Sequence, residues 1–207
     1  MTVTADPLAD VSRETLKKLR SFMDHLVKWT GTINLIAPST IGSAWDRHII
    51  DSTQIFALIP SDARALLDLG SGGGLPGIVI AIMATERRPD LAITLVESDQ
   101  RKAAFLRSMI REFDLNAKVL VQRIETMSDL QADVVTARAL APLDVLLSFA
   151  HRLLHDQGTA IFLKGRSHAA EVEAARSHWT FDLTETVSRT DPDSRILHIE
   201  SIRRVIA

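Results

Sequence analysis

The stretch LDLGSGGGLPG, from Leu67 to Gly77, decides how this chain folds. The apolar residues 65–67 lead into it, and a second apolar run, residues 78–83, follows Pro76. The pattern predicts a buried strand, a tight loop and a helix, because glycine permits positive φ and proline suits the first helical turn. Backbone N–H groups of such a loop approach a ligand closely, so the loop is typical of a nucleotide-cofactor site.

Two overlapping motifs in this loop leave the choice of cofactor open. Residues 72–77 fit G-x-G-x-x-G, which is typical of dinucleotide binding. Residues 68–74 fit acidic-x-G-x-G-x-G, which resembles motif I of class I S-adenosylmethionine (SAM) methyltransferases. SAM has no phosphate but carries an ammonium and a sulfonium cation, so an acidic side chain near the loop can meet positive charge. Asp68 therefore favours SAM.

An acidic residue also ends the next predicted strand. The run over residues 91–96 stops at Glu97, about 20 residues beyond the loop, where a carboxylate can accept hydrogen bonds from ribose hydroxyls. Both cofactors contain that ribose. Glu97 therefore supports the fold without deciding between the cofactors.

The composition excludes several classes of protein. With 207 residues, 46% hydrophobic and 24% charged, the chain has material for one domain with a short extension. It has no cysteine for disulfides or thiolate metal sites, and its histidines show no metal-ligand spacing, so we expect no metal and a cytoplasmic protein. No apolar run approaches the roughly 18 residues of a membrane span. Because the net charge is −2, any RNA contact must come from a local basic patch.

The order of the predicted elements indicates an α/β fold. Residues 1–62 should form an N-terminal helical extension, with helices over 12–29 and 41–58. Residues 63–207 should form one domain whose alternating elements build a doubly wound, mostly parallel, Rossmann-like sheet. We expect strands at 65–69, 91–96, 117–121, 133–137, 159–163, 179–186 and 195–204, and helices at 77–87, 99–114, 142–155 and 168–178. The last two strands have no helix between them, so an antiparallel pair should close the sheet, as in class I SAM methyltransferases.

Several blocks of sequence together resemble one family. They are RHIIDS at 47–52, GLPG at 74–77, LVES at 95–98, RIE at 123–125, TARA at 136–139 and KG at 164–165. In this order they resemble the RsmG (GidB) family, bacterial SAM-dependent enzymes that methylate guanine N7 in 16S ribosomal RNA. The resemblance spans residues 30–165 and implies the class I methyltransferase fold and the same activity.

The resemblance also implies a SAM site on the matching positions. Gly70 and Leu75 belong to its loop. Ile124 and Glu125 would flank the adenine, although Ile124 is larger than the residue usual at that place. Arg138 would lie beside the cofactor and the reacting atoms. The physical arguments above add Asp68, Gly72, Gly74 and Glu97 to the cofactor site.

Methylation of guanine N7 requires the enzyme to align the base with the methyl donor, and it requires little acid–base chemistry. N7 carries a lone pair and no proton, so no general base is needed. Arginine and lysine are natural donors to guanine O6 and to phosphate. Our candidates for this work are Arg47, His48, Arg138 and Lys164. A solvated helix face is the alternative for Arg47 and His48, and Asp51 could simply pair with Arg47.

The expected function is methylation of 16S rRNA, free or in the small ribosomal subunit, by a monomer. One alternative is a nicotinamide-dependent oxidoreductase, although the chain has no tyrosine for a Tyr-x-x-x-Lys pair. Another is a non-catalytic protein that binds RNA or ribosomes. Binding of SAM or of NAD separates the first two, and methyl incorporation separates the first from the third.

Overall fold

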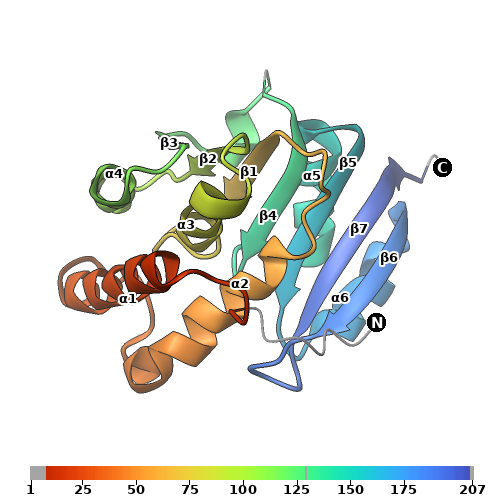
Figure 1. The fold of residues 1–207 in the computed structure, drawn as a ribbon. Coiled ribbons are helices and arrows are strands. Elements are labelled where there is room, and N and C mark those ends of the chain that lie inside the picture. The colour runs from red at the N-terminus through yellow and green to blue at the C-terminus, as the bar shows by residue number, and fades with distance from the viewer. Residues whose placement is uncertain (1–7, 129, 206–207) are drawn as a thin grey trace.

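The fold is a seven-stranded sheet with helices on both faces, seen in a computed structural model that describes residues 8–128 and 130–205 (Figure 1). The strands are β1 (Ala65–Leu69), β2 (Ala92–Val96), β3 (Ala117–Leu120), β4 (Ala132–Arg138), β5 (Leu154–Lys164), β6 (Trp179–Val187) and β7 (Arg195–Arg204). The helices are α1 (Arg13–Ile33), η1 (Pro38–Ser43), η2 (Trp45–Ile50), α2 (Asp51–Phe56), α3 (Gly77–Arg87), α4 (Gln100–Phe113), η3 (Ile124–Thr126), α5 (Leu143–Leu153) and α6 (His168–Ala175).

The strand order β3-β2-β1-β4-β5-β7-β6 places the glycine loop at the centre of the sheet. Strands β1 to β5 are parallel, and β7 enters antiparallel between β5 and β6. The predicted fold class is thus confirmed, including the closing antiparallel pair. The largest difference in a boundary is at β5, which begins at Leu154, where the sequence predicted the end of a helix. Helix α6 also ends earlier than predicted, at Ala175 and not at residue 178.

The N-terminal helices differ from the prediction in two places. Helix α1 does not end at residue 29, as predicted, but continues to Ile33, because Asn34 in the left-handed conformation ends it and donates its backbone N–H to the Thr30 carbonyl oxygen. The helix predicted over 41–58 is divided into the 3₁₀ helix η1, the π-helix η2 and the α-helix α2. Apolar spacing marks a buried face but does not report which carbonyl each N–H reaches, so the sequence could not show these changes.

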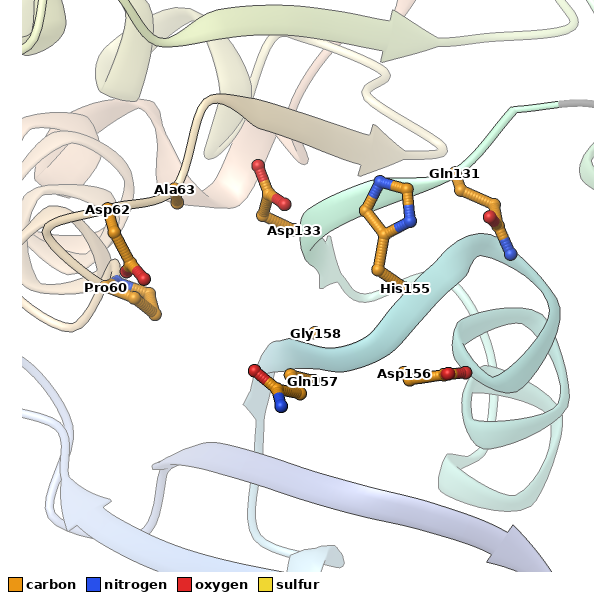
Figure 2. A pocket seen from close by; sticks show the side chains of 9 residues that line it. All are labelled: Pro60, Asp62, Ala63, Gln131, Asp133, His155, Asp156, Gln157 and Gly158. Carbon is orange, nitrogen blue, oxygen red and sulfur yellow. The ribbon is translucent and has the colours of Figure 1, made fainter.

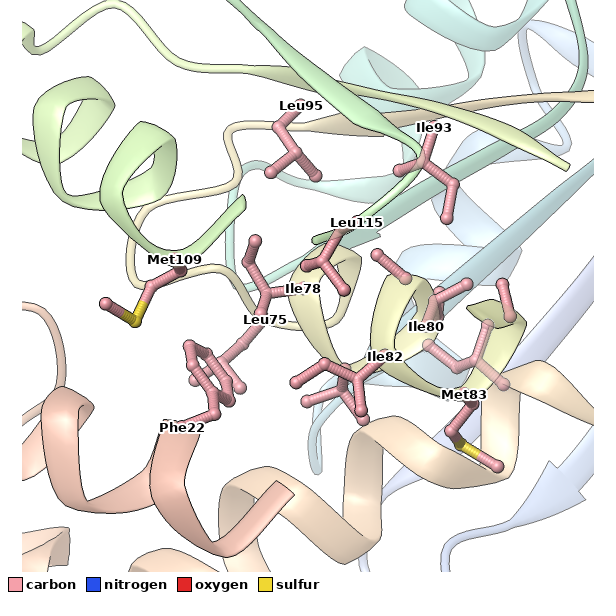
Figure 3. Packing of buried hydrophobic residues seen from close by; sticks show 14 of the residues in the cluster. Phe22, Leu75, Ile78, Ile80, Ile82, Met83, Ile93, Leu95, Met109 and Leu115 are labelled. Atoms are coloured by element: carbon pink, nitrogen blue, oxygen red, sulfur yellow. The ribbon is translucent and has the colours of Figure 1, made fainter. Parts of the chain in front are cut away.

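The core consists of two apolar layers, one on each face of the sheet. Leu66 belongs to one layer and Leu67 to the other, as alternation along a strand requires. The first layer joins α1, α3 and α4, and Figure 3 shows Phe22 of α1 packed beside Leu75 and the apolar side chains of α3. Phe22 is fully buried, and burying such a side chain stabilises a fold by about 1.5–3 kcal/mol. The N-terminal helices therefore share the core of the sheet, and the boundary predicted at residues 62/63 stays a prediction.

Candidate active site

The side chain of Asp68, in β1, holds the glycine loop in place through hydrogen bonds. This side chain is fully buried. Its Oδ1 accepts from Thr136 Oγ1 at 2.9 Å, and its Oδ2 accepts from the N–H of Gly77 at 3.2 Å. Burial raises the pKa of Asp68 to about 6, although these hydrogen bonds oppose the shift. The contacts of Asp68 are thus with the loop and β4, and its predicted contact with a cofactor cation stays a prediction.

Among the positive-φ glycines of the loop, only Gly72 has open space where a side chain would lie. Gly70, Gly72 and Gly74 all have positive φ, at 62°, 53° and 83°. A Cβ on Gly70 would lie 2.5 Å from Leu140, and one on Gly74 would lie 2.6 Å from Ile78. A Cβ on Gly72 would meet only the Gly70 carbonyl oxygen, at 3.7 Å. The loop is therefore packed at two of its three positive-φ glycines and free at the third.

Glu97 lies directly against this open side. Its Oε2 accepts from the N–H of Gly72 at 2.9 Å, and its Oε1 accepts from the N–H of Asp99 at 2.7 Å. The carboxylate is buried, yet each oxygen still has a lone pair for another donor. Glu97, the open backbone at Gly72 and the absence of a Cβ together fit an adenosine cofactor whose ribose hydroxyls donate to the carboxylate.

The other predicted cofactor residues lie around the loop at different depths. Leu75 is buried in the core beneath the loop. Ile124 is buried in η3, which follows β3, and Glu125 beside it is exposed. Arg152 of α5 holds this turn, since its guanidinium donates to the carbonyl oxygens of Ile124 and Glu125 at 3.0 and 3.2 Å. An apolar Ile124 at a fixed turn is suited to packing against an adenine face.

Arg138, the last residue of β4, reaches into the N-terminal helices. Its Nη2 donates to the Arg47 carbonyl oxygen at 3.0 Å and to His48 Nδ1 at 2.6 Å. Its Nη1 is buried 3.8 Å from Asp51 Oδ2 and has no hydrogen-bond partner among the described residues. Burial lowers the pKa of Arg138 and the Asp51 carboxylate opposes that shift, so the guanidinium keeps its charge.

His48 is held as a neutral imidazole. A guanidinium only donates, so His48 Nδ1 must accept from Arg138, and Nε2–H is left to donate to Thr40 Oγ1 at 2.9 Å. Thr40 in turn donates to the Ala37 carbonyl oxygen at 2.7 Å. Burial and the charges of Arg138 and Arg47 lower the pKa of His48 to about 4. Neither ring nitrogen has a lone pair free for a proton, so His48 is not arranged as a general base.

Lys164, the last residue of β5, is paired inside the protein. Its Nζ lies 2.5 Å from Glu171 Oε2 and donates to the Ala141 carbonyl oxygen at 2.9 Å. Burial raises the pKa of Glu171, but hydrogen bonds from Lys164 and Ser167 outweigh it and hold that pKa below its ordinary value. Lys164 thus joins the end of β5 to the segment before α5 and to α6.

A single cavity is lined by Arg47, His48, Arg138 and Lys164. It has a volume of about 410 Å³ and lies at the carboxyl ends of β4 and β5, between η2 and the β6–β7 connection. Ligands of open α/β sheets bind at this edge. The structure therefore brings the four predicted residues together, and their roles stay predictions.

Sequence reasoning missed the acidic and hydroxyl partners in this cavity. Asp51 faces Arg138 and not Arg47, because Asp51 is buried whereas Arg47 lies on the exposed side of η2. The suggested pairing of Asp51 with Arg47 is therefore wrong. Ser188 and Thr190 of the β6–β7 connection donate to Asp51 at 2.8 and 3.0 Å. More than 130 residues separate these partners, so no local pattern could have joined them.

A second cavity, of about 510 Å³, lies at the opposite edge of the sheet. Figure 2 shows Asp133, His155 and Gln131 around it, near the starts of β4 and β5. Asp133 is already used in the fold, since its carboxylate accepts the N–H groups of Arg64 and Ala65. Because this edge holds the amino ends of the parallel strands, the cavity at the carboxyl ends is the candidate active site.

Comparison with known proteins decides between the remaining functions. A family model described as "GidB: rRNA small subunit methyltransferase G" matches residues 15–197, which include the glycine loop and the candidate cavity. The chain belongs to the GidB family. It is a SAM-dependent methyltransferase, so the nicotinamide-dependent and non-catalytic alternatives are wrong.

Full-length relatives and distant structures agree with this assignment. Ribosomal RNA small subunit methyltransferase G of Ruegeria sp. (strain TM1040) is 50% identical over 196 residues, which cover 95% of each chain. The protein of the same name from Paracoccus denitrificans (strain Pd 1222) is 51% identical over 194 residues, 93% of this chain and 98% of the relative.

Two solved structures show the shared fold. The ribosomal protein L11 methylase from Lactobacillus delbrueckii subsp. bulgaricus has a TM-score of 0.60 at 13% identity, covering 74% of this chain and 78% of that one. An O-methyltransferase from Bacillus cereus, in complex with SAH, has a TM-score of 0.56 at 15% identity, covering 87% of this chain and 90% of that one. Among the described residues, no helix is long and apolar enough to cross a membrane.

Proposed function

We propose that this GidB-family protein transfers the methyl group of SAM to N7 of a guanine in 16S rRNA. Its relatives of about 50% identity are named as ribosomal RNA small subunit methyltransferases, which supports ribosomal RNA as the substrate. The RNA is presented free or within the small subunit, and the enzyme works as a monomer in the cytoplasm.

The observation that carries this proposal is the position of Arg138 between the two halves of the site. Ala137 pairs with Leu69 across β4 and β1, so Arg138 ends β4 at the level where Gly70 begins the glycine loop. The guanidinium of Arg138 then lines the cavity with Arg47, His48 and Lys164. A cofactor in the loop and a base in the cavity would meet beside this side chain.

The residues around the open side of the loop would hold SAM. Glu97 would accept hydrogen bonds from the ribose, and Ile124 with Glu125 would border the adenine. Gly72 leaves backbone in place of a side chain where the cofactor approaches, whereas Gly70 and Gly74 let the loop pack closely against Leu140 and Ile78. Leu75 and Asp68 hold the loop in this conformation through packing and a hydrogen bond to Gly77. SAM supplies a methyl group that its sulfonium already activates.

The work of the cavity residues is then to hold the guanine and its phosphate. N7 must keep its lone pair for the methyl group, so the donors act on O6 and on phosphate oxygens. Arg47 is exposed at the rim, where it can reach phosphate, whereas Arg138 and Lys164 lie deeper in the cavity. His48 fixes the guanidinium of Arg138 and removes no proton, which agrees with a reaction that needs no base.

The test is methyl transfer from radiolabelled SAM to 30S subunits and to naked 16S rRNA. Borohydride reduction and aniline cleavage, which act at 7-methylguanosine, then locate the methyl group. We expect one methylated guanine, cleaved by this chemistry. A methyl group on an exocyclic nitrogen, or RNA binding without transfer by a protein that binds SAM, would contradict the proposal. Sedimentation of the protein tests its monomeric state.

A further inference from the structure

Asp51 connects three parts of the chain at the candidate active site. It begins α2, directly after the π-helix η2 that carries Arg47 and His48. Its side chain is only 13% exposed and lies between Arg138 of β4 and the β6–β7 connection. A carboxylate this deeply placed is costly to bury unless both its oxygens are used.

The two oxygens of Asp51 face different partners. Oδ1 accepts from Ser188 Oγ at 2.8 Å, from Thr190 Oγ1 at 3.0 Å and from Gln54 Nε2 at 3.4 Å. Gln54 Oε1 also accepts the N–H of Arg189, so the connection is fixed to α2 twice. Three donors leave Oδ1 no capacity for Arg138.

Oδ2 is left to face the guanidinium. It lies 3.8 Å from Arg138 Nη1, beyond hydrogen-bond distance but close enough for a strong interaction of charges. Nη1 is buried without a hydrogen-bond partner, while Nη2 is fixed by His48 and the Arg47 carbonyl oxygen. Arg47 adds a second positive charge nearby, which disfavours a charged Arg138. The Asp51 carboxylate opposes both this repulsion and the cost of burying the Arg138 charge.

We propose that Asp51 is a positioning residue of the methyltransferase: its Oδ1 is anchored to the β6–β7 connection, and the charge on its Oδ2 holds the Arg138 guanidinium in the cavity. This inference rests on the proposed function of the cavity. Asp51 acts through Arg138 and does not touch the reacting atoms. The ionic interaction keeps the guanidinium oriented without occupying the donor hydrogens of Nη1.

The test is a double-mutant cycle with Asp51→Asn, Arg138→Ala and the two combined. Asp51→Asn keeps an oxygen for Ser188 and Thr190 but removes the charge. We expect it to slow single-turnover methyl transfer at least tenfold at saturating SAM and RNA, with SAM affinity changed less than threefold. In the Arg138→Ala background it should change the rate less than twofold, because its partner is gone. Equal losses in both backgrounds would overturn the proposal.

Thr190→Val is the matched control, because it removes one hydrogen bond to Oδ1 and leaves the charge. We expect a smaller loss of rate than in Asp51→Asn, because Ser188 and Gln54 still donate to Oδ1. A loss equal to that of Asp51→Asn would overturn the role that we assign to the charge. If Asp51→Asn does not fold, Asp51→Glu, which moves the charge by one methylene, replaces it in the cycle.

A second measurement distinguishes a failure of this inference from a failure of the proposed function. If the wild-type protein methylates no rRNA, the same cycle is measured by urea unfolding. Coupling between Asp51 and Arg138 in stability then supports the positioning role, whereas additive losses of stability overturn it. The methylation result for wild type alone decides the proposed function.

Discussion

Arg138 Nη2 lies 2.6 Å from His48 Nδ1, so the ring nitrogen that a general base would use is already occupied by a guanidinium. The pKa of His48 is lowered to about 4, chiefly by burial and by the Arg138 charge. We therefore expect the single-turnover rate at saturating SAM and RNA to show no ionisation step near pH 6.5. A rapid-quench series from pH 5.5 to 8.5 measures this.

His48→Gln provides the control for that series. Glutamine can still accept from Arg138 through its carbonyl oxygen, so the variant should lose RNA affinity more than rate. A steep pH–rate profile in the wild-type protein that disappears in His48→Gln would show proton transfer by His48 and contradict our account.

Arg138→Ala should reduce turnover more than SAM affinity, because the guanidinium lies in the cavity and the loop retains its own contacts. We expect a loss of at least 100-fold in the single-turnover rate, equal to about 2.7 kcal/mol of transition-state stabilisation. Calorimetry with SAM should show a change below tenfold. A variant that lost SAM binding but kept its rate at saturating SAM would place Arg138 with the cofactor alone.

Arg138→Ala should also raise the pKa of His48. With the Arg138 charge removed, the pKa of His48 should move up from about 4 towards the ordinary value, since that charge is the second largest cause of the shift. NMR titration of the His48 ring in Arg138→Ala and in wild type measures the difference. Unchanged titration would show that burial alone sets this pKa.

Two glycines of the loop should respond to substitution in opposite ways. A side chain at Gly72 would enter open space on the proposed cofactor side, so Gly72→Val should abolish SAM binding and leave a folded protein, less stable by roughly 1–2 kcal/mol for its positive φ. Gly74→Ala should instead lower the melting temperature strongly, because its Cβ would lie 2.6 Å from Ile78. Calorimetry and thermal unfolding of both variants test this contrast.

Glu97→Ala should weaken SAM binding by about 1–3 kcal/mol, the range for losing hydrogen bonds to a charged group. The structure adds a second reason, because Glu97 also holds the N–H of Gly72 at 2.9 Å. Asp99→Ala is a suitable comparison, since the Asp99 side chain caps α4 through the N–H groups of Arg101 and Lys102, and the backbone N–H that Asp99 donates to Glu97 is kept. Equal SAM affinity in Glu97→Ala and wild type would remove Glu97 from the site.

The fold could be predicted from the sequence because its signals are local. The loop at 70–74 needs glycines for positive φ, and Leu66 and Leu67 alternate between two faces of a buried strand. The cavity residues could be predicted for a related reason, since Arg138 and Lys164 end parallel strands and such ends meet at one edge.

The partners of those residues could not be predicted, because they depend on contacts between distant segments. Nothing near Asp68 indicates that Thr136 and the N–H of Gly77 would bury it below the loop. Nothing near Lys164 indicates its ion pair with Glu171. The sequence thus predicts which charged groups reach the site, and the packing decides which of them remain available to a substrate.

Asp68 and His48 should give this protein opposing pH effects on stability. Asp68 has a raised pKa of about 6, so the folded protein binds that proton more tightly than the unfolded chain does. Its contribution is present below about pH 4 and is lost as the pH rises through 6. His48 has a lowered pKa of about 4, so its contribution is present above about pH 6.5 and is lost as the pH falls through 4.

Each shift of about two pKa units corresponds to roughly 3 kcal/mol, so between pH 4 and 6.5 the stability lost at Asp68 is nearly offset by the stability gained at His48. Single substitutions should expose them. Relative to wild type, the free energy of unfolding of Asp68→Asn should rise with pH by about 2–3 kcal/mol over this range, whereas that of His48→Gln should fall by a similar amount. Urea unfolding at half-unit pH steps measures both differences. Curves for the two variants that run parallel to wild type would show that neither group titrates differently in the folded protein.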